Sequence, residues 1–210
     1  MDVVEKLRWR YATKKFDAKK KLSGDQLGLL KKSFNLTPTS YGLEPLKLIL
    51  ISNDNLREEL LEHSGNQRQV VTASHLLVLC IETKVDQNFI KTSFDRAQEI
   101  RQTPDEIIMP YKEFLLGFFE DMNAEEKEIW ATNQVYLALG NLLTTCAAHQ
   151  IDACPMEGFD AEAYDRVLKL KEKGLASKII LPVGFRAEDD QFAGFEKVRR
   201  PLDEVVIEID

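Results

Sequence analysis

The sequence predicts an α+β fold, in which several helices surround a few strands without alternating strictly with them. Three apolar runs, at residues 46–51, 76–81 and 177–185, have the length and composition of buried strands. Helical segments separate these runs in an irregular order, which argues against a doubly wound parallel sheet. The chain has 210 residues, of which 44% are hydrophobic, and this is enough for one domain with a substantial core.

A long helix is expected from about residue 126 to residue 149, because no proline intervenes between Ile129 and His149. The segment Asn123 to Glu126 is expected to cap this helix. Its apolar residues recur at spacings of three and four and extend round most of its surface, which predicts a helix buried in a core or an interface. The apolar positions are Ile129, Trp130, Val135, Tyr136, Leu137, Ala138, Leu139, Leu142, Leu143 and Cys146. Asn133, Gln134 and Asn141 make the segment too polar for a membrane span.

Shorter helices are expected elsewhere along the chain. Asp2 caps one over residues 2–9, and the capping box of Ser23 and Gln26 opens another that runs to Phe34. Further helices are expected from residue 54 to about 63, and from 160 to about 170.

Three other segments carry weaker signals. Residues 70–73 are expected to lead straight into the second strand. Residues 86–122 are expected to form a charged helical excursion. Its apolar residues are less regularly spaced than those of the long helix, which suggests that it covers another part of the molecule. The tail, Val205 to Ile209, has the composition of a strand.

Composition excludes several classes of protein. The net charge of −7 and the pI near 5.2 argue against nucleic acid as a partner, because phosphate backbones require a basic surface. The acidic start of the chain lacks a signal peptide, and no run is apolar enough for a membrane. Cys80, Cys146 and Cys154 all lie in apolar contexts and suggest buried, reduced thiols. A cytoplasmic protein is expected.

Common catalytic motifs are absent from the sequence. No two of the ten glycines lie two positions apart, which excludes a GxGxxG dinucleotide fingerprint, and no P-loop is present. The sequence has no HExxH or GxSxG motif, and His63, His75 and His149 are scattered. We therefore expect no metal site.

Three polar features could converge on a phosphate group. They are a basic segment with aromatics at residues 10–17, a hydroxyl-rich loop at 35–42, and the Lys-x-Arg pattern at 197–199. The turn at 155–158 could offer backbone N–H groups to the flat end of the same ligand. A solvated charged loop and an ordinary turn are the alternative interpretations of these segments.

The order and spacing of six segments resemble those of the nitroreductase family, whose members are FMN-dependent NAD(P)H oxidoreductases. The likeness covers nearly the whole chain and is greatest to the oxygen-insensitive branch, which includes dihydropteridine-reductase-like enzymes. The matching segments are 10–16, 38–45, 65–66 before 73–75, 134–141, 155–159 and 197–199.

The resemblance implies a fold and an activity. The fold would be a single FMN-binding domain over residues 1–210, with a central, mostly antiparallel sheet flanked by helices. Two chains would form an intertwined homodimer with an exchanged C-terminal strand. NADH or NADPH would reduce FMN by hydride transfer and then dissociate. A nitroaromatic, a quinone or a similar acceptor would bind in the same place and be reduced, in a ping-pong scheme. The alternatives are a non-catalytic flavin-binding or sensing protein on the same scaffold, and a helical interaction protein whose motifs match by chance.

The resemblance also implies roles for individual residues. Arg10, Lys197 and Arg199 would hold the FMN phosphate. Lys14 would stabilise the charge of the reduced ring, and Asn66, assisted by Gln69, would bind the ring edge. Backbone N–H groups of Glu157 and Gly158 would reach the flavin, with Lys14 and Glu157 as the catalytic positions and Phe119 on the substrate face. Pro38, Thr39, Ser40 and Gln134 would come from the other subunit. The remaining cofactor-binding positions would be Tyr11, Ala12, Gly42, Pro155 and Met156.

Three departures from the family pattern accompany these assignments. Ala12 stands where the family often has serine, which removes one potential hydrogen bond to the cofactor. Glu44-Pro45-Leu46 replaces a common Gln-Pro-Trp. Gln69 stands where some relatives have lysine, so Lys14 would bear the flavin charge alone.

Overall fold

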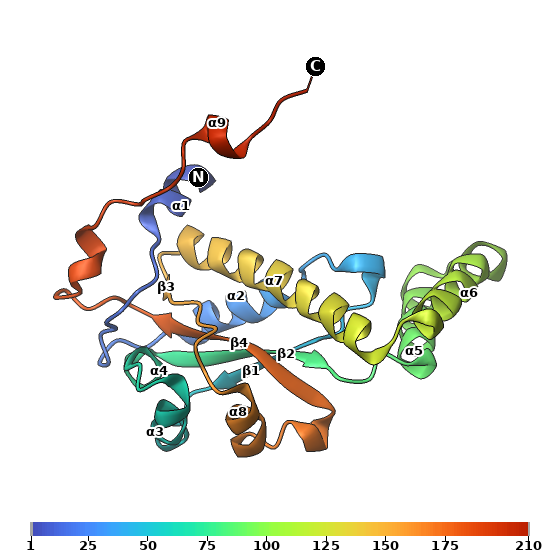
Figure 1. Cartoon of the computed structure of the whole chain (residues 1–210), viewed down its shortest axis with the longest axis horizontal. Coiled ribbons are helices and arrows are strands. Elements are labelled where there is room, and N and C mark those ends of the chain that lie inside the picture. The colour runs from blue at the N-terminus through green and yellow to red at the C-terminus, as the bar shows by residue number, and fades with distance from the viewer. Residues whose placement is uncertain (1, 210) are drawn as a thin grey trace.

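A computed structural model describes residues 2–209 and places an antiparallel sheet between two helical layers (Figure 1). Its strands are β1 (Leu46–Ile51), β2 (His75–Glu82), β3 (Asp152–Ala153) and β4 (Leu175–Gly184), in the order β1-β2-β4-β3. Each neighbouring pair is antiparallel. The predicted α+β class, the three long strands and the antiparallel sheet are confirmed.

The two faces of β2 supply two separate hydrophobic cores, as the alternation of side chains along a strand requires. Leu77 and Leu79 pack with the helices on one face, whereas Leu76 and Val78 pack with those on the other. β2 is buried along almost its whole length because it lies between β1 and β4. Gly184 closes β4, where a Cβ atom would lie 2.9 Å from the backbone nitrogen of Ser74, so only glycine permits this approach.

The long helix α7 (Ala124–Ala148) crosses one face of the sheet, with α2 (Gly24–Asn35) beside it (Figure 1). Both helices begin at the capping boxes expected of them, Asn123 with Glu126 and Ser23 with Gln26. The face of α7 that carries Val135, Ala138 and Leu142 is buried. The opposite face of α7 is exposed in the single chain, so the predicted burial on most sides would require an interface with a second chain, which stays a prediction.

The second face of the sheet is covered by α3 (Asp54–Leu61), α4 (Gln69–Thr72) and α8 (Ala161–Val167). A 3₁₀ turn, Glu62–Ser64, follows α3, and another, Lys171–Lys173, precedes β4. The expectation that residues 70–73 lead directly into a strand is wrong, because Val70 to Thr72 belong to the helical turn α4 and β2 begins only at His75. Buried Arg57 explains the turn, since its guanidinium donates hydrogen bonds to the carbonyl oxygens of Val70 (3.4 Å) and Ala73 (2.6 Å).

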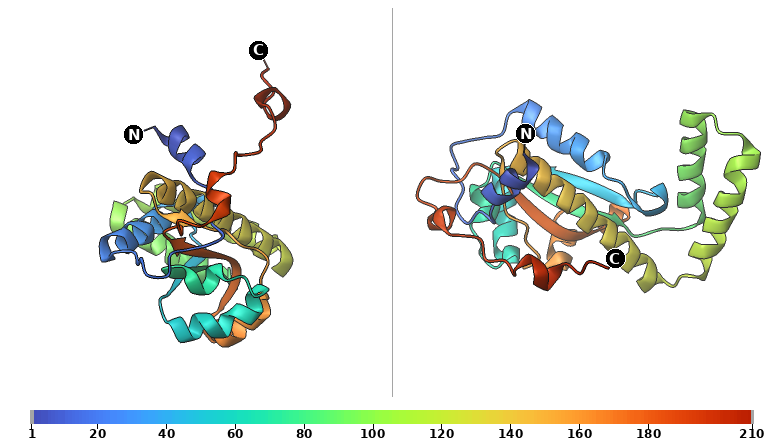
Figure 2. Two further views of the ribbon diagram at one scale, coloured as in Figure 1. Left: turned by 90° about the vertical axis from the view of Figure 1, so that its left-hand side faces the viewer. Right: turned by 90° about the horizontal axis from the view of Figure 1, so that it is seen from above.

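Helices α5 (Gln87–Arg101) and α6 (Asp105–Asp121) form a hairpin that projects from one end of the molecule (Figure 2). Ile90, Phe94, Leu115 and Phe119 give the hairpin a small core of its own. Exposed aromatic rings remain on α6, among them Phe114 and Phe118.

Both ends of the chain lie on the same side of the body, the side of α7 (Figure 1). Helix α1 (Val3–Trp9), capped by Asp2 as expected, stands above α7, and the segment after β4 passes close to it (Figures 1 and 2). A 3₁₀ turn, Gln191–Gly194, and a short helix α9 (Leu202–Val205) interrupt this segment. Val205 is therefore helical, and residues 206–209 form no strand within this chain. Their pairing with a second chain stays a prediction.

Candidate active site

Three basic side chains from opposite ends of the sequence meet beside α1. The ammonium group of Lys197 donates a hydrogen bond to the carbonyl oxygen of Arg10. Burial lowers the pKa of Arg10, and the nearby positive charge of Arg199 lowers it further. Burial and the charges of Arg10 and Arg199 likewise lower the pKa of Lys197. The cluster of these three cations, called the basic cluster below, is thus under mutual repulsion that a bound anion would relieve.

The segment after the basic cluster is held against β3. Ala12 forms a parallel bridge with Ala153, and the N–H of Thr13 donates to the Ala153 carbonyl at 3.3 Å. This bridge leaves Lys14 exposed, with its ammonium nitrogen 4.0 Å from the sulfur of Cys154. Burial raises the pKa of the Cys154 thiol, so Lys14 faces a neutral group rather than a counter-ion.

The turn at 155–158 is fixed to the edge of β4. Met156 and Ile180 exchange backbone hydrogen bonds of 2.9 and 3.1 Å. Glu157 and Gly158 are exposed, and within residues 2–209 no backbone carbonyl accepts a hydrogen bond from either N–H group. These two donors are available to a ligand, which fits the planar edge of a flavin.

Side chains from two other elements hold this turn. The Gln67 amide donates to the carbonyl oxygen of Gly158 at 3.3 Å, and the Tyr136 hydroxyl donates to the Glu157 carboxylate at 2.7 Å. Asn66, in a left-handed conformation with φ of 55°, is exposed beside Gln67. Gln69 is buried next to Cys154, the residue that the Lys14 ammonium group also approaches. The sequence interpretation missed the roles of Gln67 and Tyr136.

Arg186 and Asp152 form a second feature that the sequence interpretation missed. The Arg186 side chain lies against the rings of Trp9 and Tyr11, 4.2 and 4.5 Å from their centroids. Its guanidinium pairs with buried Asp152, with Nη2 2.6 Å from Oδ1. A lone carboxylate within the apolar run 151–154 was the signal that could have revealed the pair, since such a charge is rarely buried unpartnered.

Asp190 is a third missed residue. It is 6% exposed and accepts hydrogen bonds from the Tyr11 hydroxyl and from backbone N–H groups of the segment 14–15. Burial acts to raise its pKa, yet the hydrogen bonds from Tyr11, Lys15 and Lys14 outweigh this and hold the pKa below the usual aspartate value.

The residues expected from the other subunit form a separate group near the hairpin. Gln134 is 4% exposed, and its side chain accepts from the N–H of Ser40 at 2.9 Å and donates to the Trp130 carbonyl at 2.9 Å. The side chain of Gln134 therefore supports the loop that carries Pro38 and Thr39, and is not free to contact a ligand in this conformation. The Thr39 hydroxyl accepts from the Glu44 N–H at 3.2 Å.

Phe119 is 1% exposed and packs edge-on against Trp130, with ring centroids 4.8 Å apart. The expectation that Phe119 covers a substrate is not met in this conformation, because its ring belongs to the core of the hairpin. Phe118, the adjacent exposed ring, contacts Tyr41 at 5.7 Å between centroids. Tyr41 belongs to the 3₁₀ turn Ser40–Gly42 and has a φ of 60°.

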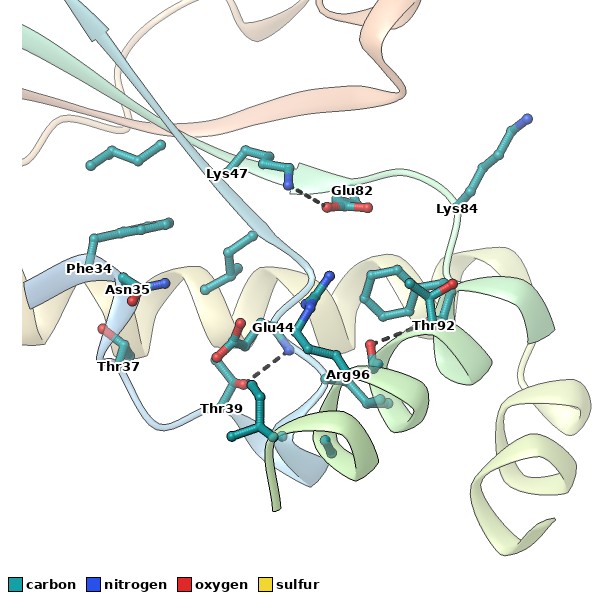
Figure 3. A pocket seen from close by; sticks show the side chains of 18 of the residues that line it. Phe34, Asn35, Thr37, Thr39, Glu44, Lys47, Glu82, Lys84, Thr92 and Arg96 are labelled. Atoms are coloured by element: carbon teal, nitrogen blue, oxygen red, sulfur yellow. Dashed lines mark hydrogen bonds and ion pairs between the residues drawn. The ribbon is translucent and has the colours of Figure 1, made fainter. Parts of the chain in front are cut away.

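An open groove of about 1040 Å³ lies between β1, α2 and α5 (Figure 3). Of the expected site residues it includes Thr39 and Gly42, and it includes no member of the basic cluster. Lys47 and Glu82 form an ion pair of 3.1 Å there, and Arg96 approaches from α5. This groove therefore follows the outer edge of β1 and is separate from the basic cluster.

The fold and these side chains define a class of protein: an α+β domain with an antiparallel sheet, a cluster of three cations and a turn with two available backbone donors. Comparison with known proteins identifies it further. The nitroreductase family model matches residues 7–185, and the chain belongs to the nitroreductase family.

Relatives of similar length agree with this membership. An oxygen-insensitive NAD(P)H nitroreductase of Salmonella typhimurium is 32% identical over 217 residues, covering 100% of both chains. The oxygen-insensitive NAD(P)H nitroreductase of Enterobacter cloacae is 31% identical and covers 99% of this chain and 100% of its own. A protein from Exiguobacterium sibiricum, solved in complex with FMN, superposes with a TM-score of 0.85 at 20% identity and covers 100% of this chain and 98% of its own.

No helix among residues 2–209 combines the length and apolarity needed to cross a membrane. No group of three or more histidine, cysteine, aspartate or glutamate side chains in this part of the chain gathers as a metal ion would require.

Proposed function

We propose that this protein is an FMN-dependent NAD(P)H oxidoreductase that reduces nitroaromatics, quinones or similar electron-poor acceptors. The observation that carries the proposal is the meeting of Arg10, Lys197 and Arg199, together with a turn at 155–158 that has two available backbone donors. Membership of the nitroreductase family and the relatives' activity support it. When bound, FMN supplies the redox chemistry, with NADH or NADPH as the electron donor.

The residues of the chain have distinct tasks in this proposal. The basic cluster binds the phosphate group, for which guanidinium is suited by its charge and its planar array of donors. Lys14 places a positive charge beside the ring and favours its negatively charged forms. Asn66 and the N–H groups of Glu157 and Gly158 orient the ring edge. Because these donors are exposed, the site is open to small molecules.

The proposal includes a homodimer that completes the site. The exposed face of α7 is apolar, with Ile129 55% and Leu137 52% exposed in the single chain, and such a face favours a protein partner. In a two-fold dimer the loop 38–42 of one chain would face the basic cluster of the other. The two groups of expected site residues would then form one site, although they lie apart within a chain.

The C-terminal segment, residues 202–209, would stabilise this dimer. Val206, Ile207 and Ile209 are exposed and follow a proline-led helical turn. The outer edge of β1 has no neighbouring strand among residues 2–209, and the groove runs along it (Figure 3). An added strand from the second chain would satisfy the backbone groups of that edge and fill the groove.

The competing function is a non-catalytic flavin-binding or sensing protein. It requires a flavin face closed to donors and acceptors, whereas Lys14, Glu157 and Gly158 are exposed in the single chain. The enzyme is therefore the better supported of the two.

The visible spectrum of the purified protein tests the proposal. We expect flavin bands that bleach on anaerobic addition of NADH or NADPH and return when a quinone or a nitroaromatic is added. Bands that persist with both nucleotides would support the flavin-binding protein instead. A protein that shows no flavin bands after incubation with FMN would contradict both functions.

A further inference from the structure

Asp190 joins two segments that the proposed cofactor site needs, although it is not among the expected site residues. We propose that Asp190 is a positioning residue for FMN, which aligns the segment of Tyr11 and Lys14 with the segment that carries Lys197 and Arg199. This inference rests on the proposed function and adds a determinant of cofactor affinity and potential to it.

Three of the four hydrogen bonds that Asp190 accepts converge on a single oxygen atom. Oδ2 accepts from the Tyr11 hydroxyl at 2.7 Å and from the backbone N–H groups of Lys14 at 3.0 Å and Lys15 at 3.1 Å. Oδ1 accepts from the N–H of Phe192 at 3.1 Å and so begins the 3₁₀ turn Gln191–Gly194. Four donors satisfy the buried charge, which would otherwise be strongly unfavourable at this site.

The N-terminal and C-terminal segments are held together at two points, and the hydrogen bonds of Asp190 form the first of them. On the N-terminal side they fix the backbone of Lys14, and the N–H of Ala187 also donates to the Lys15 carbonyl at 2.9 Å. On the C-terminal side the chain leaves Asp190 through the 3₁₀ turn and reaches Lys197, whose ammonium group returns to the Arg10 carbonyl. The relative placement of the basic cluster and Lys14 therefore depends on Asp190.

The donors to Asp190 are neutral groups, so its carboxylate does not form an ion pair with the positive charges of the site. Among residues 2–209 no lysine, arginine or histidine forms an ion pair with Asp190. The carboxylate thus orders the backbone of Lys14 without neutralising its ammonium group, which stays available to a ligand. A lysine paired with Asp190 would lose that capacity.

Asp189 offers a matched control for a test by substitution. It is the adjacent residue and carries the same charge, but it is exposed, and its ion-pair partner among residues 2–209 is the side chain of Lys15. Asp190→Asn and Asp189→Asn therefore remove the same charge one residue apart. Asparagine at 190 keeps one acceptor oxygen and turns an N–H₂ group toward donors, so the hydrogen bonds cannot all be kept.

The experiment titrates apoprotein with FMN and follows the quenching of flavin fluorescence. We expect Asp190→Asn to weaken FMN binding roughly tenfold or more, because charge-assisted hydrogen bonds are lost, and Asp189→Asn to change it less than about twofold. At saturating FMN the reduction potential and the visible bands of Asp190→Asn should also differ from those of the wild-type protein. Equal affinity and potential in both variants and the wild type would overturn the inference.

A purely structural role for Asp190 would give a different set of results in these measurements. The thermal midpoint of the apoprotein would fall in Asp190→Asn, while FMN affinity, potential and spectrum at saturation would match the wild type, and this outcome also overturns the inference. If Asp190→Asn does not fold, Tyr11→Phe removes one donor and keeps the carboxylate. It should weaken FMN binding a few-fold, and an unchanged affinity would count against positioning.

The test separates this inference from the proposed function. Wild-type protein that binds no FMN contradicts the proposed function, and the role of Asp190 falls with it. Wild-type protein that binds FMN with the same affinity and potential as Asp190→Asn leaves the proposed function intact and rejects the inference alone.

Discussion

The Tyr136 hydroxyl on α7 donates a hydrogen bond of 2.7 Å to Oε1 of Glu157, in the turn that follows β3. The carboxylate raises the pKa of Tyr136, because it stabilises the protonated hydroxyl as a donor. Tyr136 lies next to Leu137 on the exposed face of α7. One hydrogen bond thus connects the proposed dimer interface with the proposed cofactor turn.

Substitution of Tyr136 by phenylalanine should loosen the turn without unfolding the protein. The bond lies between exposed groups, so the thermal midpoint should fall by no more than about 2–4 °C. FMN affinity should fall roughly two- to fivefold, because the turn keeps its bonds to Ile180 and Gln67 but loses one support. Tyr111→Phe, a change at an exposed tyrosine on the hairpin, is the control and should leave FMN affinity unchanged. An equal effect of both substitutions would contradict the role of Tyr136.

Local sequence signals were sufficient for much of the fold. The long strands follow from apolar runs, and the start of α7 follows from Asn123 and Glu126, because a capping box involves only neighbouring residues. α4 was missed because Val70, Val71 and Thr72 are β-branched residues typical of strands. Arg57, from another helix, binds the carbonyl of Val70, and such a distant contact overrides the local preference.

The candidate site was predictable only where its residues belong to recognisable segments. Arg10 and Lys197 were named from such segments, and the structure brings them into contact. Asp190 was missed because the run of acidic residues at 188–190 is typical of a solvated surface, and three of its four hydrogen-bond donors lie more than 170 positions away. No pattern in the sequence indicates which of these three adjacent acidic residues is buried.

A second prediction concerns the phosphate contact of the basic cluster. Arg199→Gln should weaken FMN binding roughly tenfold, because a charge-assisted contact to the phosphate is lost. Arg200→Gln, which removes the same charge from the exposed neighbour, should have little effect. Titration with riboflavin, which lacks the phosphate, should show no difference between the two variants. If Arg199→Gln weakened riboflavin binding as much as FMN binding, the residue would not act on the phosphate.

A third prediction concerns the charge beside the ring. Lys14→Gln should lower the reduction potential of bound FMN, because the positive charge that favours the reduced form is removed. A tenfold relative weakening of the reduced form corresponds to about 30 mV for a two-electron couple. Lys15→Gln is the control, since Lys15 pairs with Asp189 at the surface. Spectroelectrochemical titration of the three proteins would measure the effect, and equal potentials would refute the role of Lys14.

A fourth prediction tests the exposed face of α7. Leu137→Glu should convert the dimer to monomer at micromolar concentration, because an unpaired carboxylate would be buried in the interface. Leu137→Met keeps an apolar side chain of similar volume and should remain dimeric. Light scattering after size-exclusion chromatography would distinguish the two states. Dimeric Leu137→Glu would mean that this face of α7 is not the interface.

The last prediction concerns the C-terminal segment. Removal of residues 202–210 deletes the exposed side chains of Leu202, Val205, Val206, Ile207 and Ile209 and leaves the basic cluster intact. If this segment adds a strand to β1 of the second chain, the truncated protein should dissociate at least tenfold more readily and should lose FMN on dilution. Ile207→Lys in the full-length chain is the matched point change, because its charge would enter the groove beside β1. Hydrogen exchange should then increase in Leu46–Ile51, whose outer backbone groups the added strand would protect. A truncated protein with unchanged dimer affinity and unchanged exchange in β1 would show that the C-terminal segment is not exchanged between the two chains.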